Sequence, residues 1–360
     1  NFLDDAIEVD IDAICDGKEV VIGGGLYKEY RTDDARLVIE VLKTAVKKGA
    51  KALNYIQANS FVYENKKAVG ANVEDVTTGN TFAIKAHKIV NAAGPWVDEL
   101  RRSDNSLKGK RLHLTKGVHI VVPFGRLPLK QAIYFDVADG RMVFAIPRDK
   151  VTYIGTTDTN YKEAIDKPVA SKADVDYLLN AINFIVPNQN LKVEDVSSSW
   201  AGLRPLIHED GKDPSELSRK DEIFHSPSGV ISIAGGKLTG FRKMAERTVD
   251  IVAQQLSDEK KKTYKPCTTD KIKLSGGEFN NPGDVAKLIA EVKAKTGLKE
   301  VEARILVEKY GSNTNTILAN AETKEGDWAT KLLLAELEYA ISEELVYTPA
   351  DFLVRRTGRL

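Results

Sequence analysis

One stretch decides the fold of this chain: Val230-Ile231-Ser232-Ile233-Ala234-Gly235-Gly236-Lys237-Leu238-Thr239. Its first half predicts a strand, and the residues after Thr239 predict an amphipathic helix. Two adjacent glycines at such a strand-to-helix turn let the backbone approach a flat ligand closely, because they carry no Cβ atom. The following helix offers unpaired N–H groups and a positive dipole end to an electron-rich group. We therefore expect a cofactor to lie against this turn, in contact with Gly235, Gly236, Leu238 and Thr239.

A second strand with a glycine ending spans Lys88-Ile89-Val90-Asn91-Ala92-Ala93-Gly94-Pro95-Trp96. Ligand sites of α/β folds lie at the carboxyl ends of strands, and small residues there let an extended cofactor pass. Asn91, Gly94 and Pro95 are therefore the expected cofactor contacts in this segment. Taken alone, the segment is also typical of a buried strand followed by a tight turn.

Length and composition are those of a globular protein with more than one structural unit, because 360 residues are enough for two or three cores. Basic and acidic residues number 52 each, so no global field attracts nucleic acid, and we expect no nucleic-acid partner. Cys15 and Cys267 lie far apart without a nearby histidine pair, which argues against a metal site and a disulfide framework. No apolar stretch approaches the length of a membrane span. These features predict a cytoplasmic protein.

Hydrophobic spacing predicts a mixed α/β region followed by an all-helical tail. Thr32 and Asp33 can cap a helix that Gly49 closes, and Ser171 opens another with Asp174 in a capping box. Strands are expected at residues 61–64, 68–75, 81–84, 88–92, 118–123, 131–135, 142–147 and 152–155, with a hairpin turn at Thr78-Gly79-Asn80. Three or four amphipathic helices follow from Pro282. We therefore place one domain at residues 1–267 and a helical domain at residues 268–360.

Three cations are candidates for holding an anionic substrate: Arg204, Arg219 and Lys237. Arginine forks and lysine point charges both pair with oxyanions, so the set suits a small phosphorylated or carboxylated substrate. Arg204 stands between Gly202 and Pro205, which predicts that it projects from a rigid turn. A surface salt bridge is the competing interpretation for each cation. It applies least to Lys237, because this lysine follows a glycine turn and precedes an apolar helix.

Among the five histidines, His119 has the strongest functional case, because it stands at the start of an apolar strand. An imidazole can act as a base near neutral pH. A structural histidine fits the same spacing equally well. Thr156 ends another expected strand, in Gly155-Thr156-Thr157-Asp158, and is a further candidate for substrate binding.

Several long motifs occur in one order along the chain. They are Gly23-Gly24-Gly25-Leu26-Tyr27, residues 30–37, Asn91–Trp96, Thr115–His119, Gly155–Thr159, Ser199–Leu206, Ser218–Asp221 and Gly235–Thr239. Together they resemble the flavin-dependent, aerobic glycerol-3-phosphate dehydrogenases of bacteria. The resemblance covers residues 23–360, and residues 310–313 and 348–359 are similar to the helical C-terminal domain of that family.

The resemblance implies part of an FAD-dependent oxidoreductase domain of the glutathione-reductase-like or amino-acid-oxidase-like kind, with a mixed-sheet substrate domain. It implies oxidation of sn-glycerol-3-phosphate to dihydroxyacetone phosphate by hydride transfer to FAD, with electrons passed to quinone or O2. Arg204, Arg219, Lys237 and Thr156 would bind the substrate. His119 would take the hydroxyl proton, with Lys237 as the alternative base if burial makes its amine neutral. Peripheral association with the inner face of the membrane and a homo-oligomer are compatible with the same resemblance.

The chain departs from the family pattern at its beginning. Family members start with a strand, a Gly-rich turn and a helix that hold the cofactor pyrophosphate, and this sequence contains no such segment. We therefore expect a truncated form that retains FAD weakly or not at all. The connection from Ile207 to Leu217 is short, which favours quinone over O2 as the acceptor. A related amine or amino-acid oxidase and a non-catalytic fragment are the alternatives.

Overall fold

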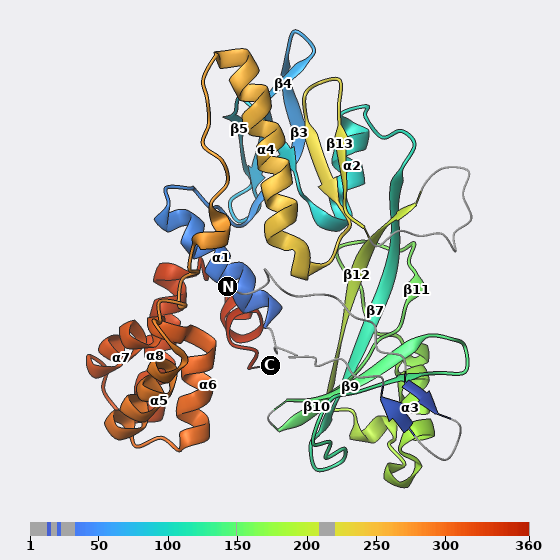
Figure 1. The fold of residues 1–360 in the computed structure, drawn as a ribbon, viewed down its shortest axis with the longest axis vertical. Coiled ribbons are helices and arrows are strands. Elements are labelled where there is room, and N and C mark those ends of the chain that lie inside the picture. The colour runs from blue at the N-terminus through green and yellow to red at the C-terminus, as the bar shows by residue number, and fades with distance from the viewer. Residues whose placement is uncertain (1–12, 16–19, 23–32, 149, 209–219, 360) are drawn as a thin grey trace. The chain divides into compact units, whose positions relative to one another are not determined.

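The computed structural model describes residues 13–15, 20–22, 33–148, 150–208 and 220–359 (Figure 1). These residues form two compact units, one of residues 56–266 and one that joins the residues up to Tyr55 to those from Cys267 onward. The sequence placed residues 1–267 in a single domain, whereas helix α1 (Asp34–Lys47) groups with the C-terminal helices. The face of α1 that is buried in this grouping carries charged side chains, namely Arg36, Glu40 and Lys43.

The largest sheet of the unit at residues 56–266 has the strand order β11-β7-β10-β9-β8, with β12 on the other side of β7. Its strands are antiparallel: β7 (Arg111–Pro123), β8 (Ile133–Asp136), β9 (Met142–Arg148), β10 (Val151–Gly155), β11 (Thr159–Asn160) and β12 (Ser198–His208). The strands expected over residues 118–155 are therefore present, and β7 begins seven residues earlier than expected.

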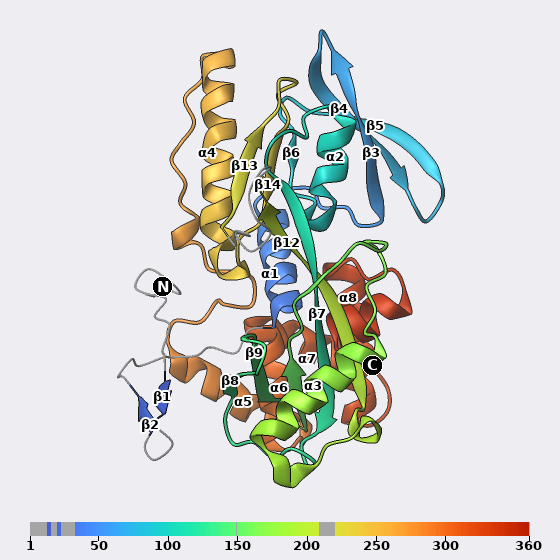
Figure 2. The same cartoon turned by 90° about the vertical axis from the view of Figure 1, so that its right-hand side faces the viewer.

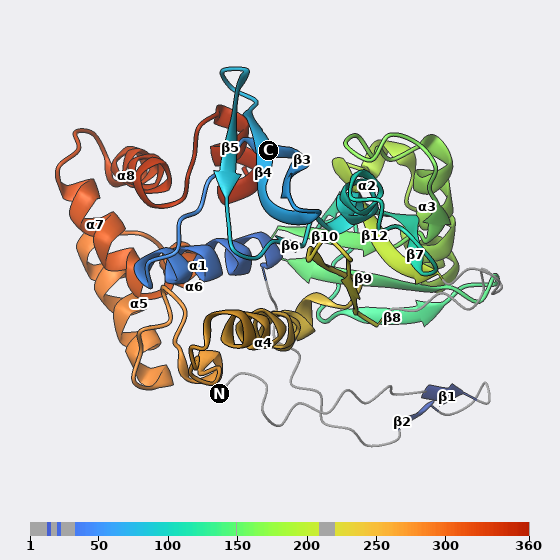
Figure 3. The same ribbon diagram turned by 90° about the horizontal axis from the view of Figure 1, so that it is seen from above.

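Helix α3 (Lys172–Ile185) covers one face of this sheet (Figures 2 and 3). Val118, Ile120 and Val122 of β7 are buried against Leu178 and Ile182 of α3. Because side chains alternate along a strand, Gly117 and His119 face the opposite side. The predicted capping box is confirmed, since Ser171 and Asp174 bond reciprocally at the start of α3.

Two smaller sheets complete this unit. One is an antiparallel meander of β3 (Ile56–Glu64), β4 (Lys67–Asp75) and β5 (Asn80–Lys85), and its β4–β5 turn contains the predicted Thr78-Gly79 step. The other has the order β13-β14-β6, with β6 (Val90–Asn91) parallel to β14 (Ile231–Ala234) and β13 (Glu222–His225) antiparallel to it. Helices α2 (Val97–Ser103) and α4 (Phe241–Lys260) follow β6 and β14.

The second unit is helical apart from a short pair of strands, β1 (Ala13–Cys15) with β2 (Val20–Ile22). Its helices are α1, α5 (Pro282–Thr296), α6 (Glu300–Tyr310), α7 (Thr314–Glu322), α8 (Trp328–Glu343) and the π-helical turn η8 (Asp351–Arg356). Leu288, Val292, Leu306, Ile317 and Ala335 belong to its core, and they come from α5 to α8. The helical tail expected from Pro282 is therefore present. No helix within the described ranges is both long enough and apolar enough to cross a membrane.

Candidate functional site

The two glycine-ended strands finish at the same edge of the small sheet. Strands β6 and β14 are parallel, with Val90 opposite Ile231 and Asn91 opposite Ser232. The residues after each strand lie together, because Ala93 packs into the same apolar cluster as Ala234 and Val97. The structure therefore brings the expected cofactor contacts of both segments to one place.

The Gly235-Gly236 turn depends on both glycines. Their φ values are +76° and +80°, a region that residues with a Cβ rarely adopt. A Cβ on Gly235 would lie 2.6 Å from the carbonyl oxygen of Lys220, and one on Gly236 would lie 2.8 Å from Sδ of Met244. The chain's own packing thus explains the pair, and the turn exposes backbone at the sheet edge. Leu238 and Thr239 follow in the turn η5 (Leu238–Gly240) and are exposed.

The turn after β6 can contact a cofactor through its backbone, whereas the side chain of Asn91, the last residue of β6, is bonded inside the protein. Gly94 has a φ of +55°, and no atom lies within 4 Å of the position that its Cβ would take. Pro95 follows inside the turn η1 (Gly94–Trp96). The buried amide of Asn91 donates to the Val97 carbonyl at 3.0 Å and to Ser232 Oγ at 3.2 Å. Asn91 therefore holds the two strands and the turn in place, and its amide protons are directed into the protein.

Arg204 lies in the middle of strand β12, which corrects the turn predicted from its Gly202 and Pro205 neighbours. Proline is tolerated in a strand at a sheet edge, where its missing N–H breaks no ladder. In the described residues β12 pairs with β7 alone, which gives it that edge position. A regular strand places Trp200, Gly202 and Arg204 on one face, opposite His119, Gly117 and Thr115 of β7 respectively.

The Arg204 guanidinium fits over a glycine. A Cβ on Gly117 would lie 2.3 Å from Nη1 and 2.4 Å from Nη2 of Arg204, so no larger residue fits beneath it. Nη2 donates to Thr156 Oγ1 at 2.8 Å, and Nη1 donates to the Thr157 carbonyl at 3.1 Å. The predicted neighbours Arg204 and Thr156 are therefore in direct contact. These bonds orient the planar fork on the sheet face.

His119 lies on the same face, over a second glycine. A Cβ on Gly155, its partner on β10, would lie 2.2 Å from Cδ2 of the imidazole. The ring stacks on Trp200 of β12 with centroids 4.9 Å apart and planes 13° apart. Its Nδ1 is buried and has no hydrogen-bond partner among the described residues. Burial, with a smaller effect of the Arg204 charge, lowers the pKa of His119 to about 4, so the imidazole is neutral at pH 7.

The other two candidate cations, Lys237 and Arg219, do not join Arg204 on this sheet face in the described structure. Lys237 is exposed at the start of the turn η5, so the structure provides none of the burial on which its role as a base depends. The expectation that its apolar neighbours keep it from a solvated face is therefore wrong. Arg219 lies outside the described residues.

An aromatic cluster beside His119 was missed by the sequence reasoning. Phe144 of β9 and Tyr153 of β10 share the face of His119, and Tyr134 of β8 extends the cluster. Trp200 packs against Tyr153 with ring centroids 5.8 Å apart. The alternation of these residues with buried aliphatic ones was visible in each strand, but which strands lie side by side is a non-local property.

Strand β12, which carries Arg204, runs on to the glycine turn. Ile207 of β12 packs with Ala234, and its Cγ1 lies 3.2 Å from the position of a Cβ on Gly235. Ile207 follows Arg204 by three residues, and three residues of strand span ~10 Å. An exposed glycine turn fits a flat cofactor at the sheet edge, and the guanidinium of Arg204 beside the His119 imidazole, whose buried Nδ1 has no partner among the described residues, fits a small anion nearby. Chemically, the arrangement can bind an oxyanion and accept a proton.

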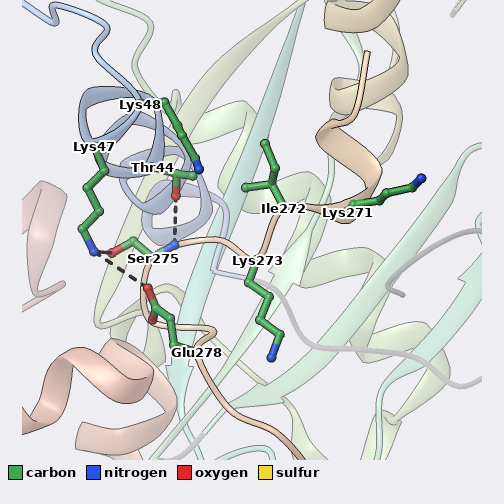
Figure 4. A pocket seen from close by; sticks show the side chains of 8 residues that line it. All are labelled: Thr44, Lys47, Lys48, Lys271, Ile272, Lys273, Ser275 and Glu278. Carbon is green, nitrogen blue, oxygen red and sulfur yellow. Dashed lines mark hydrogen bonds and ion pairs between the residues drawn. The ribbon is translucent and has the colours of Figure 1, made fainter. Parts of the chain in front are cut away.

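A separate pocket of about 360 Å³ lies in the helical unit, lined by Lys47, Lys48, Lys271 and Lys273 among others (Figure 4). Lys47 contacts Ser275 at 3.4 Å and Glu278 at 3.8 Å, and Lys273 donates to the Phe279 carbonyl at 2.7 Å. Helix α1 ends beside this pocket, and the negative end of its dipole opposes an anion. The positive charge of Lys47, in the last turn of α1, is therefore explained by the negative end of the helix dipole.

Two family models match the chain. The model of FAD dependent oxidoreductases matches residues 5–242, and that of the C-terminal domain of alpha-glycerophosphate oxidase matches residues 267–360. The first match begins upstream of Gly23, so the likeness extends further than the sequence motifs indicated. These matches confirm the predicted fold class, an FAD-dependent oxidoreductase domain followed by a helical domain.

Individual relatives give the same result. Aerobic glycerol-3-phosphate dehydrogenases of Bacillus subtilis (strain 168) and Staphylococcus haemolyticus (strain JCSC1435) are 53% and 48% identical, each over 95% of this chain and 63% of the relative. The solved structure of the glycerol-3-phosphate dehydrogenase from Bacillus halodurans complexed with FAD is 52% identical, with a TM-score of 0.84 over 94% of this chain and 66% of that one. The resemblance drawn from the motifs is confirmed. The chain spans a little under two thirds of the length of these relatives.

Proposed function

Because this chain belongs to the FAD dependent oxidoreductase family, we propose that it carries the substrate site of an enzyme that oxidises sn-glycerol-3-phosphate to dihydroxyacetone phosphate. The observation that carries the proposal is the shared sheet face, where a cation that suits phosphate lies near a neutral imidazole. The names of the relatives, aerobic glycerol-3-phosphate dehydrogenases, support the choice of substrate.

The flavin end of FAD is proposed to lie against the two turns at the small sheet's edge. Gly94 and Pro95 on one side, and Gly235, Gly236, Leu238 and Thr239 on the other, would contact it through backbone, since these residues carry few polar side-chain atoms. When bound, FAD supplies the acceptor for the two electrons of the oxidation.

Arg204 is the proposed anchor for the substrate phosphate, with Thr156 beside it and Arg219 and Lys237 as further cations. The contacts of Arg204 with Thr156 and with the Thr157 carbonyl hold its fork in one orientation before substrate arrives. A preorganised fork costs less conformational entropy on binding than a flexible lysine. Anchoring the phosphate fixes the C2 hydroxyl relative to the neighbouring imidazole.

His119 is the proposed base, in preference to Lys237, which is exposed. Because burial and Arg204 lower its pKa to about 4, the imidazole is neutral and able to accept a proton at pH 7. A phosphate dianion bound at Arg204 would offset the guanidinium charge and so strengthen the base when substrate is present. His119 would then take the hydroxyl proton as the C2 hydrogen leaves with its electron pair.

Quinone is the proposed final acceptor, with O2 as the alternative. A quinone dissolved in a bilayer implies peripheral contact with the cytoplasmic side of a membrane. Oxygen consumption during turnover, compared with reduction of a soluble quinone analogue, separates the two acceptors.

Reduction of the flavin under anaerobic conditions tests the proposed substrate. The FAD-loaded protein is mixed with glycerol-3-phosphate, glycerol, glycine or proline, and the visible flavin band is followed. We expect rapid bleaching with glycerol-3-phosphate, slow bleaching with glycerol and none with the amino acids. Bleaching by an amino acid at a rate equal to that with glycerol-3-phosphate would indicate an amino-acid oxidase and overturn the proposal.

A further inference from the structure

We propose that Trp200 is a positioning residue for His119, which holds the imidazole flat over Gly155 with one ring orientation. The catalytic meaning of this role rests on the function proposed above, whereas the positioning itself does not. Trp200 lies on β12, directly opposite His119 on β7.

The stack between the two rings is close and nearly parallel. Their centroids are 4.9 Å apart and their planes differ by 13°. On the β10 side, Gly155 lies so close to the imidazole that a Cβ there would be 2.8 Å from Nε2 and 3.0 Å from Cγ. Phe144 packs against the imidazole at 5.5 Å with a 42° tilt. The ring is therefore confined by packing contacts from three neighbouring strands.

Packing orients this imidazole, because no hydrogen bond from the described residues does so. A catalytic histidine is commonly oriented by a carboxylate or carbonyl that accepts from one ring nitrogen. The buried Nδ1 of His119 has no such partner in the described part of the chain. Among the ring's aromatic contacts, Trp200 is both the closest and the most nearly parallel, so it contributes most to fixing the ring plane.

The indole also covers a neutral ring in a charged neighbourhood. Among the described residues, the titratable groups on this part of the sheet include Arg204 of β12, Tyr153 of β10, Tyr134 of β8 and Asp158, which follows β10. Arg204 is the group whose charge acts on His119. Trp200 is 46% exposed, so one part of it faces outward while another covers the imidazole. Removing the indole would open the imidazole to water.

The direct test follows the His119 imidazole by NMR in the full chain, without added FAD or substrate. The protein is labelled with ¹⁵N-histidine, and His119→Asn identifies the signal. We expect the wild-type imidazole to stay neutral down to about pH 4 and to titrate more than one pH unit higher in Trp200→Leu. Trp200→Phe, which keeps an aromatic face, should lie nearer the wild type. The matched control is Trp328→Phe in the helical unit, where the titration of His119 should not move.

The outcomes separate positioning from a structural role. A folded Trp200→Leu protein with an unchanged His119 titration overturns the proposal, even if its melting temperature falls. If Trp200→Leu does not fold, the same criterion applies to Trp200→Thr, which suits a strand and carries no aromatic face. In the FAD-loaded protein, kcat with glycerol-3-phosphate should fall about tenfold to a hundredfold in Trp200→Leu with little change in KM, and recover partly in Trp200→Phe. An inactive wild type would count against the proposed function, and the NMR result would still decide the positioning role.

Discussion

Two regions of this chain bury polar and charged side chains, and they satisfy them differently. In the helical unit, Arg36 of α1 donates to Glu344 and Glu40, while Lys43 donates to Tyr339 at 2.7 Å and to Glu344 at 3.4 Å. The Glu344 side chain is fully buried and contacts both cations. On the open sheet face of the other unit, the buried Nδ1 of His119 has no partner among the described residues.

This difference separates a network that joins helices from a site that can take a ligand. Burial acts to lower the pKa of Arg36, but the hydrogen bond and charge of Glu344, together with the charges of Tyr310 and Glu40, outweigh burial and raise that pKa above its ordinary value. The partners of Arg36 thus come from within the unit. The sheet face instead combines a buried nitrogen that lacks a partner among the described residues with two side chains, Arg204 and His119, that lie directly over glycines. Buried charge alone is therefore a poor guide to function, whereas an unmet hydrogen bond beside an open surface is a better one.

The largest effect should come from breaking the helical network. Glu344→Gln removes the anion between Arg36 and Lys43 and leaves two buried cations with Glu40 alone. Breaking a buried pair in this way costs about 3–5 kcal/mol, so the free energy of unfolding of this unit should fall by that amount. Hydrogen exchange of the α1 and α8 amides measures it. The matched control is Glu338→Gln, whose half-exposed side chain pairs with Lys324; its loss should be under about 1 kcal/mol. Equal losses in the two variants would contradict this account.

The next largest effect concerns pH and His119. Its pKa is lowered from 6.5 to about 4 in the folded state, so the unfolded chain binds the proton more tightly. This contribution to stability is fully present above pH 6.5 and is lost as pH falls from 6.5 to 4. It amounts to about 3.5 kcal/mol, because each unit of the shift contributes about 1.4 kcal/mol. The β7 and β10 amides of His119→Phe should therefore lose less hydrogen-exchange protection between pH 7 and pH 4 than those of wild type. Parallel losses in both proteins would show that His119 is not the titrating group.

Gly155→Ala should disturb the open face without removing a group from it. The added Cβ would lie 2.2 Å from Cδ2 of His119, so the imidazole or the strand must move. A displacement near 1 Å in a catalytic group costs on the order of a hundredfold in rate, so we expect kcat of the FAD-loaded protein to fall by about that factor. Gly125→Ala is the control, because nothing lies within 4 Å of its added Cβ. A Gly155→Ala protein with wild-type kcat would mean that His119 does not act where the structure holds it.

Local patterns predicted most of the elements but fewer of the site's features. The capping box of Ser171 and Asp174, the turn before Asn80 and the helices after Pro282 depend on neighbours in sequence, and each is present. Arg204 was assigned to a turn because Gly202 and Pro205 oppose a helix, yet an edge strand accepts both. Whether a strand lies at an edge depends on distant pairing, which a single sequence does not reveal.

The site residues also divide into those that local sequence predicted and those that depend on distant strand pairing. His119 and Thr156 were chosen from strand ends, and β7 brings them together with Arg204 because it pairs with both β10 and β12. Trp200 escaped notice because its importance depends on the residue opposite it. Lys237 was expected away from solvent but is exposed. The domain boundaries and the roles of the site residues stay predictions.

The central claim is that Arg204 recognises a substrate phosphate on the face where His119 acts. Arg204→Lys keeps the charge and loses the fork, including its paired contacts with Thr156 and the Thr157 carbonyl. A charge-assisted hydrogen bond contributes about 1.5–3 kcal/mol, which corresponds to a tenfold to hundredfold loss in kcat/KM for glycerol-3-phosphate.

The most direct test is the ratio of kcat/KM for glycerol-3-phosphate to that for glycerol, measured in FAD-loaded wild type and Arg204→Lys. Glycerol has no phosphate for Arg204 to bind, so its kcat/KM should hardly change, and the ratio should fall by about tenfold to a hundredfold. If Arg204 only braces the strand, the variant should lose thermal stability and both substrates should suffer alike. A ratio that stays constant while both activities fall would contradict the account.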